Sequence, residues 1–153
     1  MSIEFAAIDF ETTGYERGEK NDPWQLGLAL VDSLGAVTET REWFFKSSVR
    51  PKAETFMNQW EEFFPLLFGR RLVAHNISTE RTLLTRIAPL TKWGPWVDTL
   101  KIAKLKYPRL KSYALCDLCA LFGVRPDLPG RTWHDALYDA VACAQLAIKL
   151  KAV

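Results

Sequence analysis

Apolar positions in the first third of the chain predict three strands joined by short connections. Residues 3–10 form a nearly continuous apolar run, which is typical of a central strand covered on both faces. A polar loop over residues 14–23 follows, and residues 24–32 have the pattern of a second strand. After a short turn at residues 33–35, residues 37–45 alternate well enough for a third strand. The short connections indicate that these strands pair as an antiparallel meander.

The rest of the chain alternates between strand-like and helical segments. Short strands are predicted at residues 71–75 and 96–98. Helices are predicted, in chain order, over residues 53–68, 79–87 with Ser78 as the cap, 99–104, 113–122 and about 133–151. Thr132 and Asp135 resemble a capping box for the last helix. Strands that first pair antiparallel and then alternate with helices predict an α/β fold, with a mixed five-stranded sheet and helices on both faces.

The length of 153 residues predicts a single domain, over residues 1–153, with a sizeable core. No segment reaches about 18 uncharged apolar residues, so no membrane span is expected. The start of the chain carries Glu4 and Asp9 and has no basic segment before its apolar run, unlike a signal peptide. These features predict an intracellular, cytoplasmic protein.

Charge and cysteine usage leave the class of partner open. The formal net charge of +2 neither requires nor excludes a nucleic-acid partner. The basic stretch over residues 101–111 would suit a phosphate backbone or a solvated surface equally well. Cys116 and Cys119 have no second ligand pair at zinc-finger spacing, and three cysteines do not suggest a disulfide framework. We therefore expect buried thiols rather than a structural metal.

Three carboxylates in the first 80 residues are candidates for metal binding. Asp9 and Glu11 are spaced i and i+2 at the end of the first predicted strand, so they point to the same face. Such a pair is costly beside a buried strand unless a divalent cation compensates for it. The ordinary alternative is that the strand ends at Phe10 and both acids are solvated. Glu80, in the first turn of a predicted helix, is favoured there by the helix dipole alone.

Asp139 and His134 lie near the start of the last predicted helix. Asp139 falls in line with Cys143, Leu146 and Leu150 at helical spacing, so it is an acid on a face that otherwise looks buried. The positive end of the helix favours a neutral imidazole at His134, as a general base requires. The two residues are five apart and not on one helix face, but they would border one cleft if the first turn opens onto it. A capping or surface histidine is the ordinary alternative.

Three motifs follow one another along the chain. The first is D-F-E-T-T-G over residues 9–14, the second is V-A-H-N over residues 73–76 followed by Glu80, and the third is H-D-A-L-Y-D-A over residues 134–140. In this order and spacing they resemble the DEDDh 3′–5′ exonuclease family, the DnaQ-like proteins that include the polymerase III proofreading subunit, RNase T and oligoribonuclease. Two intervening segments also resemble the family, so the similarity extends over nearly the whole chain.

The resemblance implies a ribonuclease H-like fold and hydrolysis of phosphodiester bonds with two divalent cations, Mg²⁺ or Mn²⁺. The implied metal ligands are Asp9, Glu11, Glu80 and Asp139. His134 is the implied general base toward the attacking water, and the implied product is a nucleoside 5′-monophosphate. The implied substrate-binding residues are Phe10, Thr12, Thr13, Gly14, His75 and Asn76. We expect the last two to organise a strand-to-helix turn rather than the chemistry.

One position departs from the family's pattern. The middle motif usually has an aspartate where this chain has Glu80, and an aromatic residue where it has Thr79. The longer acid bears on rate and metal preference more than on the type of reaction. The expected partners are 3′ ends of single-stranded DNA or RNA and no membrane, with polymerase association or a homodimer left open. The alternative function is a weakly active or inactive nucleic-acid-binding or partner-docking module that retains the exonuclease fold.

Overall fold

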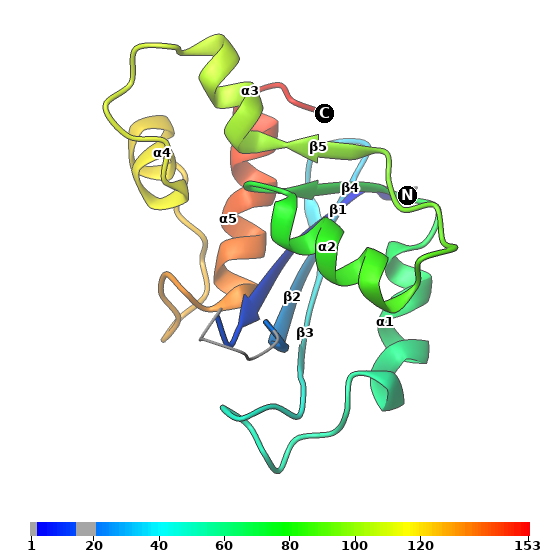
Figure 1. Ribbon diagram of the computed structural model, residues 1–153. Helices are drawn as coiled ribbons and strands as arrows, with labels where there is room; N and C mark the ends of the chain where they lie inside the picture. Colours follow the sequence, from blue (N-terminus) through cyan, green and yellow to red (C-terminus); the bar gives the residue numbers. More distant parts are fainter. Residues whose placement is uncertain (1–2, 15–20) are drawn as a thin grey trace.

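The computed structural model describes residues 3–14 and 21–153, and a five-stranded sheet forms its centre. The strands are β1 (Ile3–Thr12), β2 (Pro23–Asp32), β3 (Val37–Phe44), β4 (Arg71–Ala74) and β5 (Trp96–Asp98). They lie in the order β3-β2-β1-β4-β5 (Figure 1). β1, β2 and β3 pair antiparallel, and β4 and β5 are added parallel to β1. The predicted mixed sheet is therefore confirmed.

The carboxyl end of β1 extends past its parallel neighbour. β4 pairs with β1 only at Phe5, Ala6 and Ala7, whereas β2 follows β1 as far as Thr12. The middle of β1 is buried on both faces, as its apolar run predicts. The last residues of β1 therefore extend beyond β4. On the edge that faces β4, their backbone N–H and C=O groups are not used by the sheet and can bind other partners.

The helices are α1 (Trp60–Leu67), α2 (Ser78–Ile87), α3 (Thr99–Lys106), α4 (Leu115–Phe122) and α5 (Ala136–Lys149), with a 3-10 turn at Met57–Gln59 before α1. They cover both faces of the sheet: α1 and α2 lie on one side, and α5 with α4 on the other (Figure 1). The face under α1 and α2 is packed by residues such as Ile8, Leu28 and Phe63. The opposite face is packed under α5 by residues such as Phe5 and Val141.

The helices predicted from residues 53 and 113 begin later in the chain than expected. Residues 53–56 are not helical, because the hydroxyl of Thr55 accepts the backbone N–H of Asn58 and starts the 3-10 turn there. Residue 113 lies outside α4, since the hydroxyl of Tyr113 donates to the carbonyl of Tyr107, 2.6 Å away. Hydrogen bonds from side chains to nearby backbone groups compete with the helix at both starts.

The caps predicted for α2 and α5 are also wrong. Ser78 is the first residue of α2 and its hydroxyl donates to Oδ1 of Asn76 rather than capping the helix. α5 begins at Ala136, because the carboxylate of Asp135 accepts the backbone N–H groups of Leu137 and Tyr138. Asp135 is therefore the N-cap itself and not the second member of a capping box with Thr132.

Two smaller expectations concern the membrane and the thiols. In residues 3–14 and 21–153, no helix is both long and apolar enough to cross a bilayer. Cys119 and Cys143 are buried, as expected. Cys116 is partly exposed on α4, so the expectation of burial is wrong for this thiol.

Candidate metal and catalytic site

Asp9 and Glu11 lie at the carboxyl end of β1 and face α5. Side chains of β1 alternate between the two cores, so Phe5 and Ala7 pack under α5 while Phe10 packs on the opposite face. Asp9 and Glu11 continue the row of Phe5 and Ala7, and both carboxylates thus project on the α5 face, as their spacing predicts. The side chain of Phe10 is buried in the other core, so its contact with a substrate stays a prediction from the motif alone.

Gly27 allows α5 to lie directly against the sheet beside these acids. It pairs with Asp9 across β1 and β2. A Cβ atom at Gly27 would lie only 2.0 Å from the carbonyl oxygen of Ala136, so any side chain would push the first turn of α5 away. The close approach holds Asp139, one turn into α5, over the end of β1.

The chain ahead of α5 brings His134 and Asp139 together with Glu11. His134 has a φ of 68°, in the left-handed region, and its backbone N–H donates to Oδ2 of Asp139 at 3.2 Å. Glu11, His134 and Asp139 each offer one ligand atom, and these three atoms lie within 4.8 Å of one another. Because α5 begins only at Ala136, His134 and Asp139 border one cleft despite their five-residue spacing.

Glu80 reaches the end of β1 from α2, on the other face of the sheet. It is 3% exposed, and its Oε1 accepts the backbone N–H of Phe10 at 3.3 Å, where β4 no longer covers β1. Among the described atoms, Oε2 of Glu80 and Oδ1 of Asp139 are buried without a hydrogen-bond partner. Two buried carboxylate oxygens with unused lone pairs at one strand end fit a bound cation.

Burial and mutual repulsion raise the pKa values of these acids. The pKa of Asp9 lies well above its usual range, first because of burial and then because of the charges on Glu80, Asp139 and Glu11. Burial raises the pKa of Glu80 to about 7 and that of Asp139 to about 6. Burial and the charge of Asp139 also raise the pKa of Glu11. A cluster of carboxylates with raised pKa values is typical of a functional site, and bound cations would stabilise the deprotonated acids.

The segment after β1 turns the chain next to this site. The backbone N–H of Thr13 donates to the carbonyl of Asp22 at 2.9 Å, and the N–H of Asp22 donates to the hydroxyl of Thr13 at 3.1 Å. Gly14 has a φ of 82°, and its N–H donates to Oδ1 of Asn21 at 3.0 Å. Within residues 3–14 and 21–153, no atom lies within 4 Å of the position that a Cβ atom of Gly14 would take, and Thr12 is half-buried at the strand end. The turn therefore presents backbone beside the acids, which suits close approach of a ligand.

His75 and Asn76 hold the turn between β4 and α2. Nε2 of His75 donates to the carbonyl of Tyr113 at 2.8 Å, and its Nδ1 lies 2.9 Å from the hydroxyl of Thr99, so both ring nitrogens have protein partners. Burial lowers the pKa of His75. Asn76 has a φ of 64°, and its backbone N–H donates to Oδ1 of Asp98 at 3.0 Å. These contacts fit the organising role expected for both residues.

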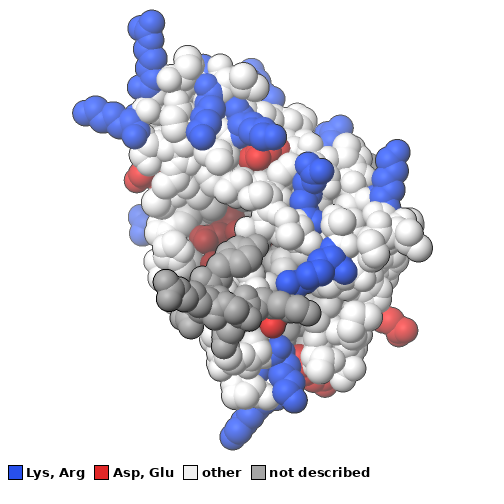
Figure 2. Space-filling model, viewed as in Figure 1, with Lys and Arg blue, Asp and Glu red and all other residues white. Residues whose placement is uncertain are grey.

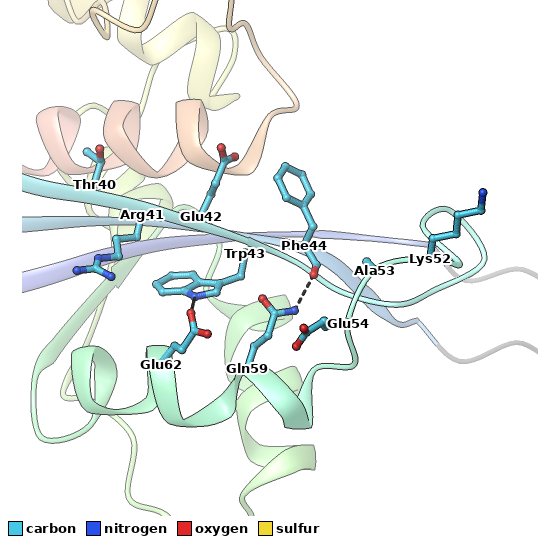
Figure 3. A pocket seen from close by; sticks show the side chains of 10 residues that line it. All are labelled: Thr40, Arg41, Glu42, Trp43, Phe44, Lys52, Ala53, Glu54, Gln59 and Glu62. Carbon is cyan, nitrogen blue, oxygen red and sulfur yellow. Dashed lines mark hydrogen bonds between the residues drawn. The ribbon is translucent and has the colours of Figure 1, made fainter.

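Arg131 ties the chain ahead of His134 to the edge of the sheet. Its guanidinium forms a bidentate pair with the carboxylate of Glu42 on β3, and Nη1 also donates to Oδ1 of Asp135 at 3.0 Å. Figure 3 shows Glu42 projecting from β3 on the side opposite Trp43, toward α5. The pair therefore spans from the edge strand to the N-cap of the helix that carries Asp139.

Gln25 on β2 completes this network. Its Nε2 donates to Oε2 of Glu42 at 3.1 Å, and its Oε1 accepts the backbone N–H of Ala136 at 3.2 Å. Gln25 is buried in a strand that is otherwise apolar around it, which is the sequence signal that could have pointed to it. The network of Gln25, Glu42, Arg131 and Asp135 was not anticipated from the motifs.

We expect Arg131→Met to lower the rate of any reaction at this site about tenfold or more, because a small displacement of a catalytic group is costly. The KM for a small substrate should stay nearly unchanged, because the variant displaces His134 without altering the other groups of the site. Arg41→Met is the matched control, since Arg41 is next to Glu42 but pairs with Glu39 at the surface. Equal turnover of both variants and the wild type would contradict a positioning role for Arg131.

A separate hollow of about 780 Å³ lies along β3, between residues 40–44 and the segment from residue 52 to α1 (Figure 3). Its walls are tied together: Nε1 of Trp43 donates to Glu62 at 3.1 Å, and Nε2 of Gln59 donates to the carbonyl of Phe44 at 2.8 Å. None of the predicted site residues lines it.

The fold and the site together define a class of protein. A mixed sheet in this order, with carboxylates at the end of its central strand and in the first turn of α5, is the arrangement of ribonuclease H-like nucleases. The sequence profile of the RNase_T family, described as exonuclease, matches residues 6–147. The chain belongs to this exonuclease family, whose members are phosphodiester hydrolases.

Curated relatives of the chain are much longer proteins. A DNA polymerase III of the PolC type from Halalkalibacterium halodurans is 33% identical over an alignment of 171 positions that covers 95% of this chain and 11% of the relative. The Bacillus subtilis protein of the same name is 33% identical over 84 positions, or 52% of this chain and 6% of the relative. The chain therefore spans about a tenth or less of the length of these relatives.

Solved structures share the fold at low sequence identity. Exonuclease X in complex with 5′ overhanging duplex DNA has a TM-score of 0.72 and is 20% identical, covering 95% of this chain and 90% of that one. The nuclease domain of 3′hExo, a DEDDh family member, bound to rAMP, has a TM-score of 0.73 and is 16% identical, with coverage of 97% and 92%. These likenesses confirm the DnaQ-like, ribonuclease H-like fold.

Proposed function

We propose that this chain acts as one exonuclease domain that removes nucleotides from the 3′ ends of single-stranded DNA or RNA and releases nucleoside 5′-monophosphates. The observation that carries the proposal is the meeting of Glu11, His134 and Asp139 within 4.8 Å at the end of β1, beside Asp9 and Glu80. The DNA polymerase III relatives make a DNA 3′ end the first substrate to test. RNA is the second, because one structural neighbour is a 3′-exonuclease that recognises the 3′ end of a histone mRNA stem-loop.

Two divalent cations fit the residues that are present. Oε2 of Glu80 and Oδ1 of Asp139 are buried and unused among the described atoms, and the acids raise one another's pKa values. Asp9, Glu11, Glu80 and Asp139 would hold the ions, and Mg²⁺ or Mn²⁺ suits an all-carboxylate set. Bound cations would supply charge stabilisation for the attacked phosphate and its leaving oxygen.

The chain's own residues account for proton transfer and orientation. His134, whose imidazole lies beside Glu11 and Asp139, accepts the proton of the attacking water at a ring nitrogen. The left-handed backbone at His134 and its bond to Asp139 fix the base relative to the acids. The Thr12–Gly14 turn lies beside the acids and presents open backbone to the terminal nucleotide. Pre-set positions of this kind lower the entropic part of the barrier.

We expect the metal-free protein to lose stability as the pH rises from about 5 to 8, the range above the ordinary carboxyl pKa of about 4. The folded-state pKa values of Asp9, Glu80 (about 7) and Asp139 (about 6) are raised. The folded state therefore binds more protons than the unfolded state in this window, and deprotonation destabilises it. Millimolar Mg²⁺ should remove most of the loss, since it binds the deprotonated acids.

The measurement is the thermal unfolding midpoint across this pH range, with and without Mg²⁺. We expect the midpoint of the metal-free protein to fall by about 5–10 °C, which corresponds to a few kcal/mol for a domain of this size. A midpoint that is independent of both pH and Mg²⁺ would contradict the crowded acidic site.

The function itself is tested by hydrolysis of two substrates. The p-nitrophenyl ester of thymidine 5′-monophosphate occupies only the active site, and a single-stranded oligonucleotide with a blocked 3′ end reports the polarity. We expect Mg²⁺- or Mn²⁺-dependent release of p-nitrophenol, and chain shortening only when the 3′ end is free. Shortening of the blocked oligonucleotide at the same rate would contradict 3′–5′ polarity.

A binding or docking module that retains the fold is the second candidate, and Glu80 is the residue that favours it. Oε1 of Glu80 accepts the backbone N–H of Phe10, so only Oε2 is left to bind a cation. Equal, negligible hydrolysis by the wild type and by Glu80→Asp would support the module. A higher rate in Glu80→Asp would instead support an enzyme slowed by the longer acid.

A further inference from the structure

A groove of about 670 Å³ lies on the outer face of α2. One wall consists of α2 residues that share a helix face, among them Arg81, Thr85 and Arg86. Lys101, near the start of α3, also lines the groove. The opposite face of α2 carries Glu80, Leu83 and Leu84, which are buried against the sheet. One helix thus presents an acid to the site and cations to the groove.

Arg81 and Lys101 supply positive charge to this groove without a compensating partner. Both side chains are exposed, and neither takes part in a side-chain hydrogen bond or ion pair within residues 3–14 and 21–153. The acid in the groove, Asp98, has its carboxylate occupied by four backbone N–H groups. Figure 2 shows Lys and Arg side chains over α2, beside a recess in which acidic atoms are visible.

Other cations of the basic stretch serve the fold. Lys106 donates to the carbonyls of Leu150 and Lys151 at the end of α5. Lys104 lies over the ring of Tyr113, 5.7 Å from its centroid. These contacts distinguish Lys101 from Lys104 and Lys106, and the groove groups it instead with Arg81, which is distant in sequence.

Two residues that line the groove connect it to the candidate site. Asn76 belongs to the turn that precedes Glu80. Arg86 also lines the groove, and its guanidinium donates to the carbonyl of Asn21 and to the carboxylate of Asp22. Asp22 is bonded in turn to Thr13 in the turn after β1. A chain that leaves the acids along α2 therefore stays within reach of this groove.

We propose that this groove binds the phosphate backbone of the substrate strand on the 5′ side of the cleaved nucleotide, through Arg81 and Lys101. The inference rests on the proposed exonuclease function, and it adds the position of the part of the strand that is not yet cleaved. Unpaired cations beside a cleavage site attract a polyanion at any sequence, which suits an enzyme that shortens a strand one nucleotide at a time. An acidic protein segment would suit the same charges and is an outcome of the test.

The test compares Arg81→Ala/Lys101→Ala with the wild type on substrates of two lengths. A single-stranded oligonucleotide of a dozen nucleotides reaches the groove, whereas the p-nitrophenyl ester of thymidine 5′-monophosphate does not. We expect the KM for the oligonucleotide to rise about tenfold. The slope of log KM against log salt concentration should also decrease by about 1.4, because two phosphate contacts are lost. Turnover of the ester should match the wild type.

Lys92→Ala/Lys149→Ala is the matched control, because it removes the same charge from exposed positions that line neither this groove nor the candidate site. An equal rise in KM in the control, or no rise in the test variant, would overturn the groove as a binding site. Loss of ester turnover in Arg81→Gln/Lys101→Gln as well as in the alanine pair would also overturn it, since the residues would then act in the active site.

Direct binding separates this inference from the proposed function. Fluorescence anisotropy of the labelled oligonucleotide in Ca²⁺ reports binding even if no substrate is hydrolysed. Binding by the wild type and the control that is weakened in Arg81→Ala/Lys101→Ala would support the groove as a binding site. Inactivity of the wild type on both substrates would separately overturn the nuclease proposal. Binding of a polyglutamate peptide in place of the oligonucleotide would overturn the groove as a nucleic-acid site.

Discussion

Asp9→Asn should reduce the hydrolysis of any substrate at least about a thousandfold, because the loss of cation binding forfeits several kcal/mol of transition-state stabilisation. Asp9 lies among Glu80, Asp139 and Glu11, whose charges raise its pKa. The same change should raise the unfolding midpoint of the metal-free protein at neutral pH, because it removes one of four mutually repelling acids. The stabilisation by Mg²⁺ should weaken at the same time.

These opposite effects on activity and metal-free stability distinguish a metal site from a structural one. Asp127→Asn is the matched control, since Asp127 is exposed and lies outside the acidic group. The control should leave the rate, the midpoint and the response to Mg²⁺ as in the wild type. A lower metal-free midpoint in Asp9→Asn, with Mg²⁺ stabilisation intact, would contradict the assignment of Asp9 as a cation ligand.

His134→Ala should lower the turnover number by about two to four orders of magnitude, the range that a general base contributes. The imidazole lies beside Glu11 and Asp139, and its removal takes away the proposed proton acceptor without removing a carboxylate. The stabilisation by Mg²⁺ should therefore persist in this variant. Rate constants at saturating substrate and unfolding midpoints with and without Mg²⁺ check both parts.

The second measurement matters because the ring of His134 is close enough to the acids to serve as a ligand instead. Loss of Mg²⁺ stabilisation in His134→Ala, comparable to that in Asp9→Asn, would show that the imidazole binds the cation. Retained stabilisation with unchanged turnover would mean that another group accepts the proton.

The sheet was predictable because its signals are local. The continuous apolar run of β1, the short turn at residues 33–35 and the switch to helical spacing after residue 53 all lie within one element or between neighbours. The start of α5 was not predictable in the same way, because Thr132 and Asp135 resemble a capping box while Asp135 caps the helix alone. The difference of three residues between the predicted and the observed start decides whether His134 lies inside or ahead of the helix.

The sequence indicates the candidate residues of the site but not their arrangement. The motifs indicated Asp9, Glu11, Glu80, His134 and Asp139, but they gave no sign that Glu80 reaches β1 from the opposite face. Gly27 carried a usable signal, since an isolated glycine in an apolar strand indicates close backbone approach. The pairing of Glu42 with Arg131 spans 89 positions and has no local signal at all.

The most direct test of the central claim is the time course of a single-stranded DNA and a single-stranded RNA, each labelled at its 5′ end, with Mg²⁺ and with Mn²⁺. A metal-dependent exonuclease of this polarity produces a ladder that shortens one nucleotide at a time from the 3′ end, and the ladder is lost in Asp9→Asn. The faster ladder would name the preferred nucleic acid and ion. Intact substrate in both metals, with a folded wild type, would contradict the account.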